Sequence, residues 1–386
     1  SRHKAALFGF EKTKAIHVQD GLAKNKHGYE RHLLLRQTGN GSIWLDSLTI
    51  VNDDCLEDEA LQNNAREIRQ RVYSLIQLVF YSFLRNNFFF DFSRLASNCY
   101  YFVLTGCENF AYGFRGSLGS SAPTDEKAVD EKGDGVSWCI YDTGNLSQTY
   151  VALCLLIILG DDLSKVDKEA ILIGVGCCQL SDGSFCSHRG SENDMRFVFT
   201  GVAICFILND FSTVNVPKIL EYIKRSINYD GGIGEGPGTE SHAGSTYCAI
   251  ASLHMLGSLW DNSVLSHKQI ERLKKWCLMK QSEGFHGRTN KPDDSCYAYW
   301  VGATLQMLDA HSFFDHNAVR RFLMSVQDRF NGFSRETDTN PDILHTYFSI
   351  AGLSLIHEPF LCPLYSPLNV TYRTYERLLK LQAKSK

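Results

Sequence analysis

Two kinds of helix-like segment alternate along the chain from residue 136 onward. Both carry apolar residues at three- and four-residue spacings, which is the period of an α-helix. The first kind is amphipathic, with charged residues around a hydrophobic stripe: KEAILIGVGCCQL, VPKILEYIKRSI, HKQIERLKKWCLMKQ and HNAVRRFLMSVQD. The second kind follows each of these and is more apolar: MRFVFTGVAICFIL, STYCAIASLHML, CYAYWVGATLQML and HTYFSIAGLSLI. Helices of the first kind are typical of a surface, and helices of the second kind of an interior.

A glycine-rich turn joins the two segments of each pair, and these turns recur at a nearly constant interval. Gly183, Gly232, Gly284 and Gly332 are separated by 49, 52 and 48 residues. A period of about fifty residues with two helices per unit predicts an all-α fold of stacked helical hairpins. Small residues in the apolar segments permit close packing, so we expect an inner and an outer ring of helices closed into an α–α barrel, or toroid. An open solenoid would have the same period.

The rest of the chain fits around this repeat as one domain. Residues 1–30 are polar and mixed, and we expect them to be poorly ordered or peripheral. Residues 31–386 are interpreted as a single α–α barrel domain, with further helix-like segments at 67–84 and 92–106. Residues 114–135 are rich in Gly, Ser and Asp without periodicity, which predicts a surface loop.

Composition and charge exclude several classes of protein. With 44% hydrophobic and 21% charged residues, the 386-residue chain is an ordinary globular protein. A net charge of −4 gives no broad attraction to phosphates, so we expect no nucleic-acid partner. The longest apolar runs, 150–160 and 78–84, are too short to span a bilayer, which predicts no direct membrane insertion. Thirteen cysteines at irregular spacing, and an N-terminus without an apolar signal core, favour reduced thiols and a cytoplasmic location.

Candidate chemistry concentrates in residues 284–300, GFHGRTNKPDDSCYAYW. Asp294 and Cys296 can both ligate zinc, but taken alone such a pair is more often a buried cysteine beside a capping aspartate. The repeat changes this interpretation, because His345 lies 49 residues after Cys296, at the start of the next inner segment. Residues that begin successive inner helices surround one end of the predicted barrel. Asp294, Cys296 and His345 therefore form a predicted zinc site.

Cations and aromatic residues near these positions carry less information by themselves. Arg196 and His242 also lie near the starts of inner segments, whereas Arg288 and Lys291 lie in a turn. Taken alone, Arg288 and Lys291 would be interpreted as part of a solvated turn. An aromatic residue on an inner helix is more often core than ligand site, and the chain has 24 Phe and 17 Tyr.

Five segments carry a family resemblance: LIILGDDLSKVDKEA, QLSDGSFCSHRGSENDMRFVF, NYDGGIGEGPGTESHAGSTYC, WCLMKQSEGFHGRTNKPDDSCYAYWVGATL and TNPDILHTYFSIAGLSL. They resemble the β subunit of protein prenyltransferases, most closely that of the type I protein geranylgeranyltransferase, over residues 138–375. GSENDMRF and PDILHTYF look like the type I geranylgeranyl enzyme rather than the farnesyl or Rab-specific relatives. A farnesyltransferase-type β subunit is the alternative. The family fold is an α–α barrel, in agreement with the repeat.

The resemblance implies an enzyme that is active as a heterodimer with a helical-repeat prenyltransferase α subunit. One Zn²⁺ per β subunit would be held by Asp294, Cys296 and His345, with an open fourth position typical of a catalytic site. The substrates would be CaaX-terminated small GTPases and similar proteins. The cysteine thiol of the CaaX motif would become a thiolate on the metal and attack C1 of geranylgeranyl diphosphate.

The resemblance also implies which residues contact the co-substrate. Those implied for the diphosphate are His242, Gly244, Arg288, Lys291 and Tyr297. Those implied for the isoprenoid are Trp300, Tyr150 and the aliphatic part of Arg196. Donors already in place where leaving-group charge develops are usually the largest single contribution to catalysis.

Two places depart from the family pattern. Arg335 stands where type I members have a lysine, a cation thought to replace the Mg²⁺ that farnesyl enzymes use. Because Arg335 keeps the charge, we predict that Mg²⁺ is not required, and we expect Lys291 and Arg335 to be catalytic. Asn145 and Ser147 stand where a His and an Ala help to read the last CaaX residue, so a preference for terminal Leu does not follow.

Two other classes explain part of the pattern. A triterpene cyclase uses the same barrel and an Asp-rich motif that residues 293–296 superficially resemble, but Gln-Trp repeats are missing and the chain is small. A non-catalytic helical-repeat scaffold, with a structural zinc or none, is the other alternative. It would leave the convergence of Arg288, Lys291 and His242 without a purpose.

Overall fold

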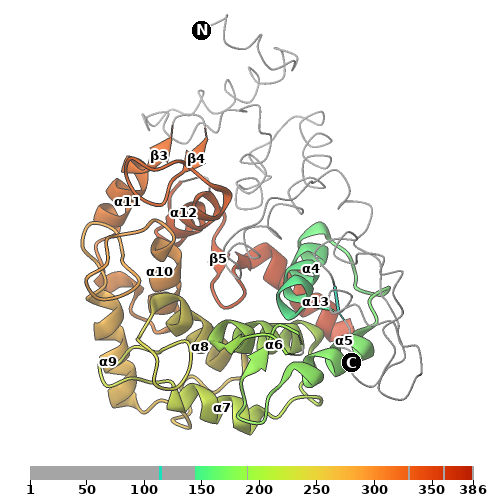
Figure 1. The fold of residues 1–386 in the computed structure, drawn as a ribbon. Coiled ribbons are helices and arrows are strands. Elements are labelled where there is room, and N and C mark those ends of the chain that lie inside the picture. Colours follow the sequence, from blue (N-terminus) through green and yellow to red (C-terminus); the bar gives the residue numbers. More distant parts are fainter. Residues whose placement is uncertain (1–112, 115–143, 189, 329–330, 360, 385–386) are drawn as a thin grey trace, which may run out of the picture.

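The computed structural model describes residues 113–114, 144–188, 190–328, 331–359 and 361–384. Within this part of the chain, helices alternate between an inner and an outer layer that follow an arc (Figure 1). The inner helices are α4 (Leu146–Leu159), α6 (Met195–Leu208), α8 (Ala243–Met255), α10 (Tyr297–Met307) and α12 (Ile343–Leu355). The outer helices are α5 (Lys168–Cys178), α7 (Val216–Arg225), α9 (His267–Leu278) and α11 (His316–Ser325). Each inner helix contacts the next, from α4 to α12, which confirms the predicted stack of helical hairpins.

Burial follows the sequence pattern that distinguished the two layers. Nearly every residue of inner helix α6 is buried, whereas outer helix α7 buries only Ile219, Tyr222 and Ile223. Small residues bring the inner helices close together. At Gly352 of α12, an added Cβ would lie 2.7 Å from the Cβ of Ala298 in α10. An apolar helix with such a surface can pack on both sides, and an amphipathic one can cover it.

Capping side chains fix where several helices begin. Asn145 begins α4, and its Oδ1 accepts the backbone N–H groups of Ser147 and Gln148 at 3.0 and 3.3 Å. Ser266 forms a capping box with Gln269 at the start of outer helix α9. These bonds satisfy N–H groups that have no partner within the helix. Asn145, one of the two departures from the family pattern, therefore serves as a helix cap in this chain.

Equivalent backbone bonds link each glycine-rich turn to the preceding inner helix. The N–H group at or just before the start of four inner helices donates to a carbonyl in the following turn at 2.8–2.9 Å: Leu146 to Ser187, Met195 to Glu235, Ala243 to Gly287 and Ser295 to Arg335. Two turns also contain short antiparallel pairs, β1 (Phe185–Cys186) with β2 (Asn193–Asp194) and β3 (Gln327–Asp328) with β4 (Gly332–Phe333). The N-terminal ends of the inner helices and the glycine-rich turns therefore lie together on one face of the arc.

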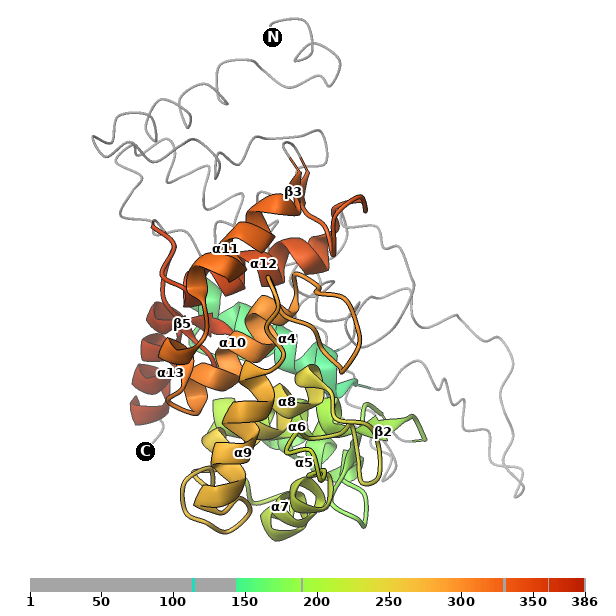
Figure 2. The ribbon, with the colours of Figure 1, turned by 90° about the vertical axis from the view of Figure 1, so that its left-hand side faces the viewer.

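The C-terminal segment lies at the opposite end of the helices (Figure 2). There β5 (Leu364–Tyr365) pairs with β6 (Val370–Thr371) and leads into α13 (Tyr372–Lys384). Four inner tyrosines donate to carbonyl groups of this hairpin at 2.7–3.1 Å: Tyr150 to Leu368, Tyr247 and Tyr299 to Ser366, and Tyr347 to Asn369. Arg377 of α13 donates to the carbonyls of Ile157 and Ile158 at the end of α4. The sequence pattern predicted none of these contacts.

Several expectations concern residues outside the described ranges. These are the N-terminal segment 1–30, the helix-like segments 67–84 and 92–106, and all but the first residue of the predicted loop 114–135. That first residue, Phe114, is buried, and its N–H donates to the Thr149 hydroxyl at 2.9 Å. Across the described ranges, no helix combines the length and the apolar character needed to cross a membrane.

Gly183 offers a test of the turn geometry. Its φ is +94°, and a Cβ added there would lie 2.0 Å from the backbone oxygen of Lys218. Gly183→Ala is expected to destabilise the protein by about 3 kcal/mol, because both the left-handed backbone and the clash oppose a side chain. Gly238→Ala is the matched control, since Gly238 has a φ of +78° with no atom within 4 Å of an added Cβ. Thermal unfolding should show a clearly larger loss for Gly183→Ala, and equal losses would contradict this packing.

Candidate active site

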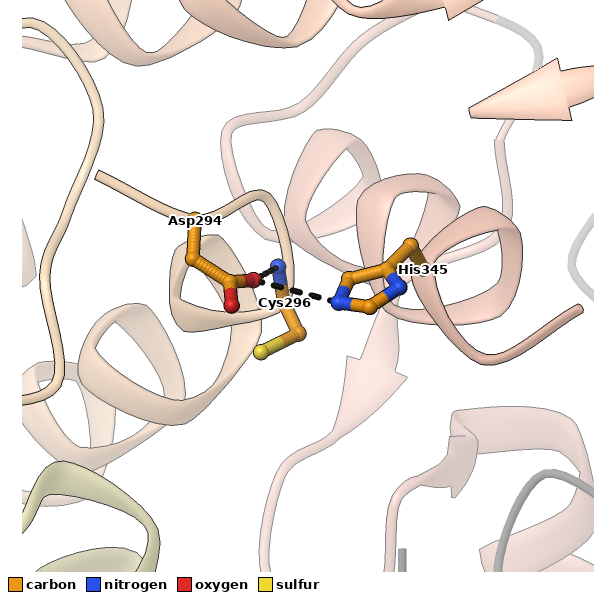
Figure 3. Close-up of side chains that lie close together, drawn as sticks. All are labelled: Asp294, Cys296 and His345. Atoms are coloured by element: carbon orange, nitrogen blue, oxygen red, sulfur yellow. Dashed lines mark hydrogen bonds and ion pairs between the residues drawn. The ribbon is translucent and has the colours of Figure 1, made fainter. Parts of the chain in front are cut away.

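The predicted zinc ligands meet at the starts of the neighbouring inner helices α10 and α12 (Figure 3). Asp294 lies just before α10, Cys296 is the N-cap residue of that helix, and His345 lies in the first turn of α12. The bond from the Ser295 N–H to the Arg335 carbonyl, 2.9 Å long, holds the two helix starts together. The repeat therefore brings residues 49 positions apart into one site.

The donor atoms of Asp294, Cys296 and His345 all lie within 4.8 Å of one another. Nε2 of His345 is 3.4 Å from Oδ1 of Asp294, and the same oxygen accepts the backbone N–H of Cys296 at 3.0 Å. Asp294 and Cys296 are both buried. A carboxylate oxygen, a sulfur and an imidazole nitrogen at this spacing fit zinc, and three protein ligands leave a fourth position for a reacting group.

Asp342 orients one of these ligands, and Trp300 acts on the pKa of another. Asp342 caps α12, accepting the backbone N–H of His345 at 2.9 Å, and its Oδ2 lies 2.5 Å from Nδ1 of the same histidine. Nδ1–H therefore donates to Asp342, and Nε2 is the nitrogen directed at Asp294, as Figure 3 shows. On the sulfur side, burial raises the pKa of the Cys296 thiol, and the Trp300 side chain, four residues later in α10, acts to lower it. Such outer partners fix both the ring orientation and the donor atom of a metal ligand.

Burial and charge set the protonation of the metal-free site. Burial alone would lower the pKa of His345, but its hydrogen bonds to Asp294 and Asp342 outweigh this and raise that pKa to about 9. Burial, followed by the charge of Asp294, raises the pKa of the Cys296 thiol. Burial also acts to raise the pKa of Asp294, but the His345 hydrogen bond and charge prevail and lower it. Without metal the site therefore holds a carboxylate, an imidazolium and a thiol at neutral pH.

Arg335 lies beside the carboxylate ligand. Its Nε is 3.1 Å from Oδ2 of Asp294, and 52% of its side chain is exposed. A guanidinium carries five N–H donors, so a bond to Asp294 leaves others for an anion at the same place. The sequence-based expectation put Arg335 near the diphosphate, and the structure puts it next to the predicted metal site.

His242 and Tyr297 form a second polar pair on the same face of the arc, at the starts of α8 and α10. Nδ1 of His242 accepts the backbone N–H of Gly244 at 3.0 Å and thereby caps α8. The ring proton must then lie on Nε2, which is 3.0 Å from the Tyr297 hydroxyl oxygen. Burial, followed by the charge of Arg288, lowers the pKa of His242 to about 4. Neutral His242 therefore donates to Tyr297, and the Tyr297 O–H is directed to another acceptor.

The turn before α10 carries Arg288 and Lys291. Asp293 holds the base of this turn, where its carboxylate accepts the Ser282 hydroxyl at 2.6 Å and the Gly284 N–H at 2.8 Å. Arg288 forms an ion pair with Glu240 at 3.5 Å, and Lys291 is exposed.

This turn lies next to the start of α8. The bond from the Ala243 N–H to the Gly287 carbonyl, 2.9 Å long, places His242 beside Arg288. Arg288, His242 and Tyr297 thus come together, near the three predicted metal ligands.

Of the remaining predicted residues, Trp300 and Tyr150 lie in the interior of the inner layer, whereas Arg196 lies in the first turn of α6 with 21% of its side chain exposed. Trp300 and Tyr150 are 1% exposed, and belong to one connected aromatic cluster. Its other members in ring contact with them are Phe199, Tyr247, Tyr299 and Phe348. Arg196 is held by Asp194, with Nε 3.0 Å from both carboxylate oxygens. Contact of Trp300, Tyr150 and Arg196 with an isoprenoid remains a prediction.

Two partners of the predicted residues were missed in the sequence. Asp342 precedes His345 by three residues at the start of an inner helix, and this spacing is typical of an N-cap that also reaches the third residue. That signal could have found it. Glu240 pairs with Arg288 of the next repeat, 48 residues later, and no local sequence motif indicates this pair.

Comparison with known proteins agrees with this architecture. Residues 54–381 match the prenyltransferase alpha-alpha toroid domain family. The chain is 41% identical over 261 residues to the geranylgeranyl transferase type-1 subunit beta of Arabidopsis thaliana, covering 66% of this chain and 67% of that protein. It is 40% identical over 236 residues to the subunit of the same name from Dictyostelium discoideum, covering 60% and 66%. The matched parts thus span about two thirds of each relative.

Among solved structures, the fold is similar to the Candida albicans protein geranylgeranyltransferase-I complexed with GGPP. The TM-score is 0.66 at 23% identity, and the match covers 89% of this chain and 98% of that one. The chain therefore belongs to the prenyltransferase alpha-alpha toroid family. Within that family, the first two relatives named above are beta subunits of the type-1 geranylgeranyl enzyme. The predicted fold class and family are both confirmed.

Proposed function

We propose that this chain is the β subunit of a type I protein geranylgeranyltransferase. It transfers a geranylgeranyl group from geranylgeranyl diphosphate to the cysteine thiol of a C-terminal CaaX motif. The observation that carries the proposal is the convergence of Asp294, Cys296 and His345, whose donor atoms lie within 4.8 Å of one another. The likeness to two type-1 beta subunits at 40% and 41% identity supports the geranylgeranyl assignment over a farnesyltransferase-type subunit.

Asp294, Cys296 and His345 would hold one Zn²⁺ per β subunit. When bound, zinc supplies a Lewis acid that lowers the pKa of a thiol at its fourth position from about 8.5. Asp342 keeps Nε2 of His345 directed at the site. Asp294 and Cys296 are buried, which limits the water that could compete with the incoming thiol.

The diphosphate would be received by the cationic groups beside this site. Arg288 offers a planar fork and Lys291 a point charge, and the Tyr297 hydroxyl donates because neutral His242 occupies its oxygen. Arg335, next to Asp294, adds a charge at the junction between the thiol and the leaving group. Arg288 and Arg335 are held by Glu240 and Asp294 before the bond breaks, so they stabilise the developing charge with little reorganisation. For this reason Mg²⁺ is not required.

The proposal includes a prenyltransferase α subunit as partner, CaaX-terminated small GTPases and similar proteins as substrates, and a cytoplasmic location. The α subunit is expected to be necessary, because the β chain alone supplies only part of the enzyme in the proposed family role. The alternative of a non-catalytic scaffold with a structural zinc predicts no transfer at all.

Transfer can be measured with the heterodimer formed by co-expression with a prenyltransferase α subunit. Geranylgeranyl diphosphate should prenylate a CaaX peptide faster than farnesyl diphosphate does. Adding Mg²⁺ at about 1 to 5 mM should change the transfer rate by less than about twofold. Preference for farnesyl diphosphate would favour the farnesyl alternative. A strong stimulation by Mg²⁺ would contradict the role of Arg335. Absence of transfer from either lipid would exclude the proposed function.

A further inference from the structure

Lys280 is a buried ammonium that the proposed mechanism does not use. It lies in the turn after α9 and is 5% exposed, whereas the other lysines of the described ranges are all more accessible. Burial lowers the pKa of Lys280, against the opposing charges of Asp230, Cys277 and Glu240. Taking a cation out of water is unfavourable unless it gains a specific interaction. The contacts of the Lys280 ammonium therefore indicate its role.

The Lys280 ammonium has two direct contacts. Nζ donates to the Thr289 hydroxyl at 3.1 Å, and it lies 4.5 Å from the centre of the Trp276 ring. Thr289 follows Arg288 directly and precedes Lys291 by two residues. The backbone carbonyl of Lys280 also accepts the His286 N–H at 3.0 Å. Both its side chain and its backbone therefore hold the turn that carries Arg288 and Lys291.

Trp276 extends this connection to the neighbouring turn. Its indole N–H donates to Oδ2 of Asp230 at 2.9 Å, and Oδ1 of Asp230 accepts the Ser241 hydroxyl at 2.7 Å. Ser241 directly precedes His242. A chain of contacts thus runs from Thr289 through Lys280 and Trp276 to the residue before His242. It links the two turns that supply the groups assigned to the diphosphate.

The turn needs such support at its middle. Asp293 ties only its base, through Ser282 and Gly284. Thr289, Asn290 and Lys291 are exposed, and Asn290 has a φ of +61°, a conformation that is unfavourable for most residues. The hydrogen bond from Lys280 is the side-chain contact that reaches this exposed part from the protein interior.

We propose that Lys280 is a positioning residue for the diphosphate: its bond to Thr289 fixes the turn that presents Arg288 and Lys291. The inference rests on the proposed function, since it concerns how the same site receives its co-substrate. The buried charge also adds positive potential behind the turn. Lys280 touches no reacting group in this role, so it acts on binding of the diphosphate and not on the metal.

The test is a double-mutant cycle in the zinc-loaded heterodimer. Lys280→Met keeps the aliphatic stem and removes the charge, and Thr289→Val removes the acceptor at an exposed position. Each is expected to raise the Kd for inorganic diphosphate and the KM for geranylgeranyl diphosphate by about tenfold, the usual worth of a charged hydrogen bond. Zinc content and the KM for the CaaX peptide should not change. The double variant should be no worse than either single one, because both remove the same bond.

Two further variants separate positioning from simple structural support. Lys280→Arg should restore binding to within about threefold of wild type, since it keeps a donor cation. Lys275→Met, on the exposed side of α9 just before Lys280, removes an equal charge and should leave the Kd for diphosphate unchanged. Lys291→Ala, a residue of the binding group itself, should weaken diphosphate binding with zinc content retained.

The outcomes distinguish this role from the proposed function. If wild type binds geranylgeranyl diphosphate and both Lys280→Met and Thr289→Val bind it equally well, the role of Lys280 is wrong. Additive losses in the double variant would also overturn it, because they would mean that the two residues act separately. Should Lys280→Met fail to fold, Thr289→Val still decides the matter. A wild-type heterodimer that binds neither the lipid diphosphate nor inorganic diphosphate would overturn the proposed function, and this role with it.

Discussion

Replacing Cys296 with alanine is expected to remove stoichiometric zinc from the heterodimer and to lower the transfer rate by more than about 100-fold. Loss of one of three protein ligands must lower the zinc affinity more than loss of a residue that hydrogen-bonds a ligand. Loss of such an outer partner typically costs about 10- to 100-fold in metal affinity or activity. Without the metal, the substrate thiol returns to a pKa near 8.5 and is only a few per cent thiolate at neutral pH. Elemental analysis of the purified heterodimer and a single-turnover transfer assay measure the two effects.

Cys205→Ala is the matched control for Cys296→Ala. Cys205 is a free, fully buried cysteine of inner helix α6, so its replacement leaves a similar small cavity without touching the site. It should retain one zinc per heterodimer and the wild-type rate. Retention of one zinc by Cys296→Ala, or absence of zinc from both variants and from wild type, would contradict the catalytic metal site.

The affinity of the metal-free protein for zinc should rise steeply with pH, by about 100-fold per unit between pH 6.5 and 8.5. In the folded metal-free site the pKa of His345 is about 9, so this histidine is protonated throughout that interval. Burial raises the pKa of Cys296, so its thiol is also protonated, whereas the lowered pKa of Asp294 keeps that carboxyl ionised. Zinc must therefore displace two protons, and higher pH favours their release. Competition with a chelator of known affinity at several pH values measures the slope.

Asp342→Asn provides the matched variant for this slope. Asparagine can still cap α12 through its side-chain oxygen, but it removes one of the two carboxylates that raise the pKa of His345. With that pKa lowered, His345 gives up its proton at lower pH, so the slope should become shallower toward pH 8.5. A zinc affinity that is independent of pH in the wild-type protein would contradict the protonation described for the metal-free site.

Periodicity is the reason that so much of the fold and the metal site could be predicted. Apolar residues recur at helical spacing, and glycine turns recur after 48 to 52 residues, so equivalent positions lie side by side. Cys296 and His345 differ by one repeat, and their neighbourhood follows directly from that period. The layers of helices and the approach of Asp294, Cys296 and His345 are both found in the structure.

Contacts made by the side chains of the turns could not be predicted. Glu240 and Arg288 lie 48 residues apart, which fits the period, but the period does not specify that their side chains pair. Lys280 bonds Thr289 through a turn conformation that no spacing rule specifies. The expectation for Arg335, a charge in place of Mg²⁺, came from the family resemblance and stays a prediction, but the sequence did not indicate that its side chain contacts Asp294. Where a long side chain ends depends on its rotamers and on its competing partners, and those are properties of the packed structure.

The tyrosine bonds to the C-terminal hairpin have a consequence for the order of synthesis. Tyr150 lies more than two hundred residues before its acceptor, the carbonyl of Leu368, so the phenol group is synthesised well before that carbonyl. Until then the phenol groups of four inner helices have no hairpin to bond, and contacts of such long sequence separation form slowly. The inner helices therefore lack these bonds until residues 364–371 have been synthesised, and chaperones can reach their apolar faces in that interval.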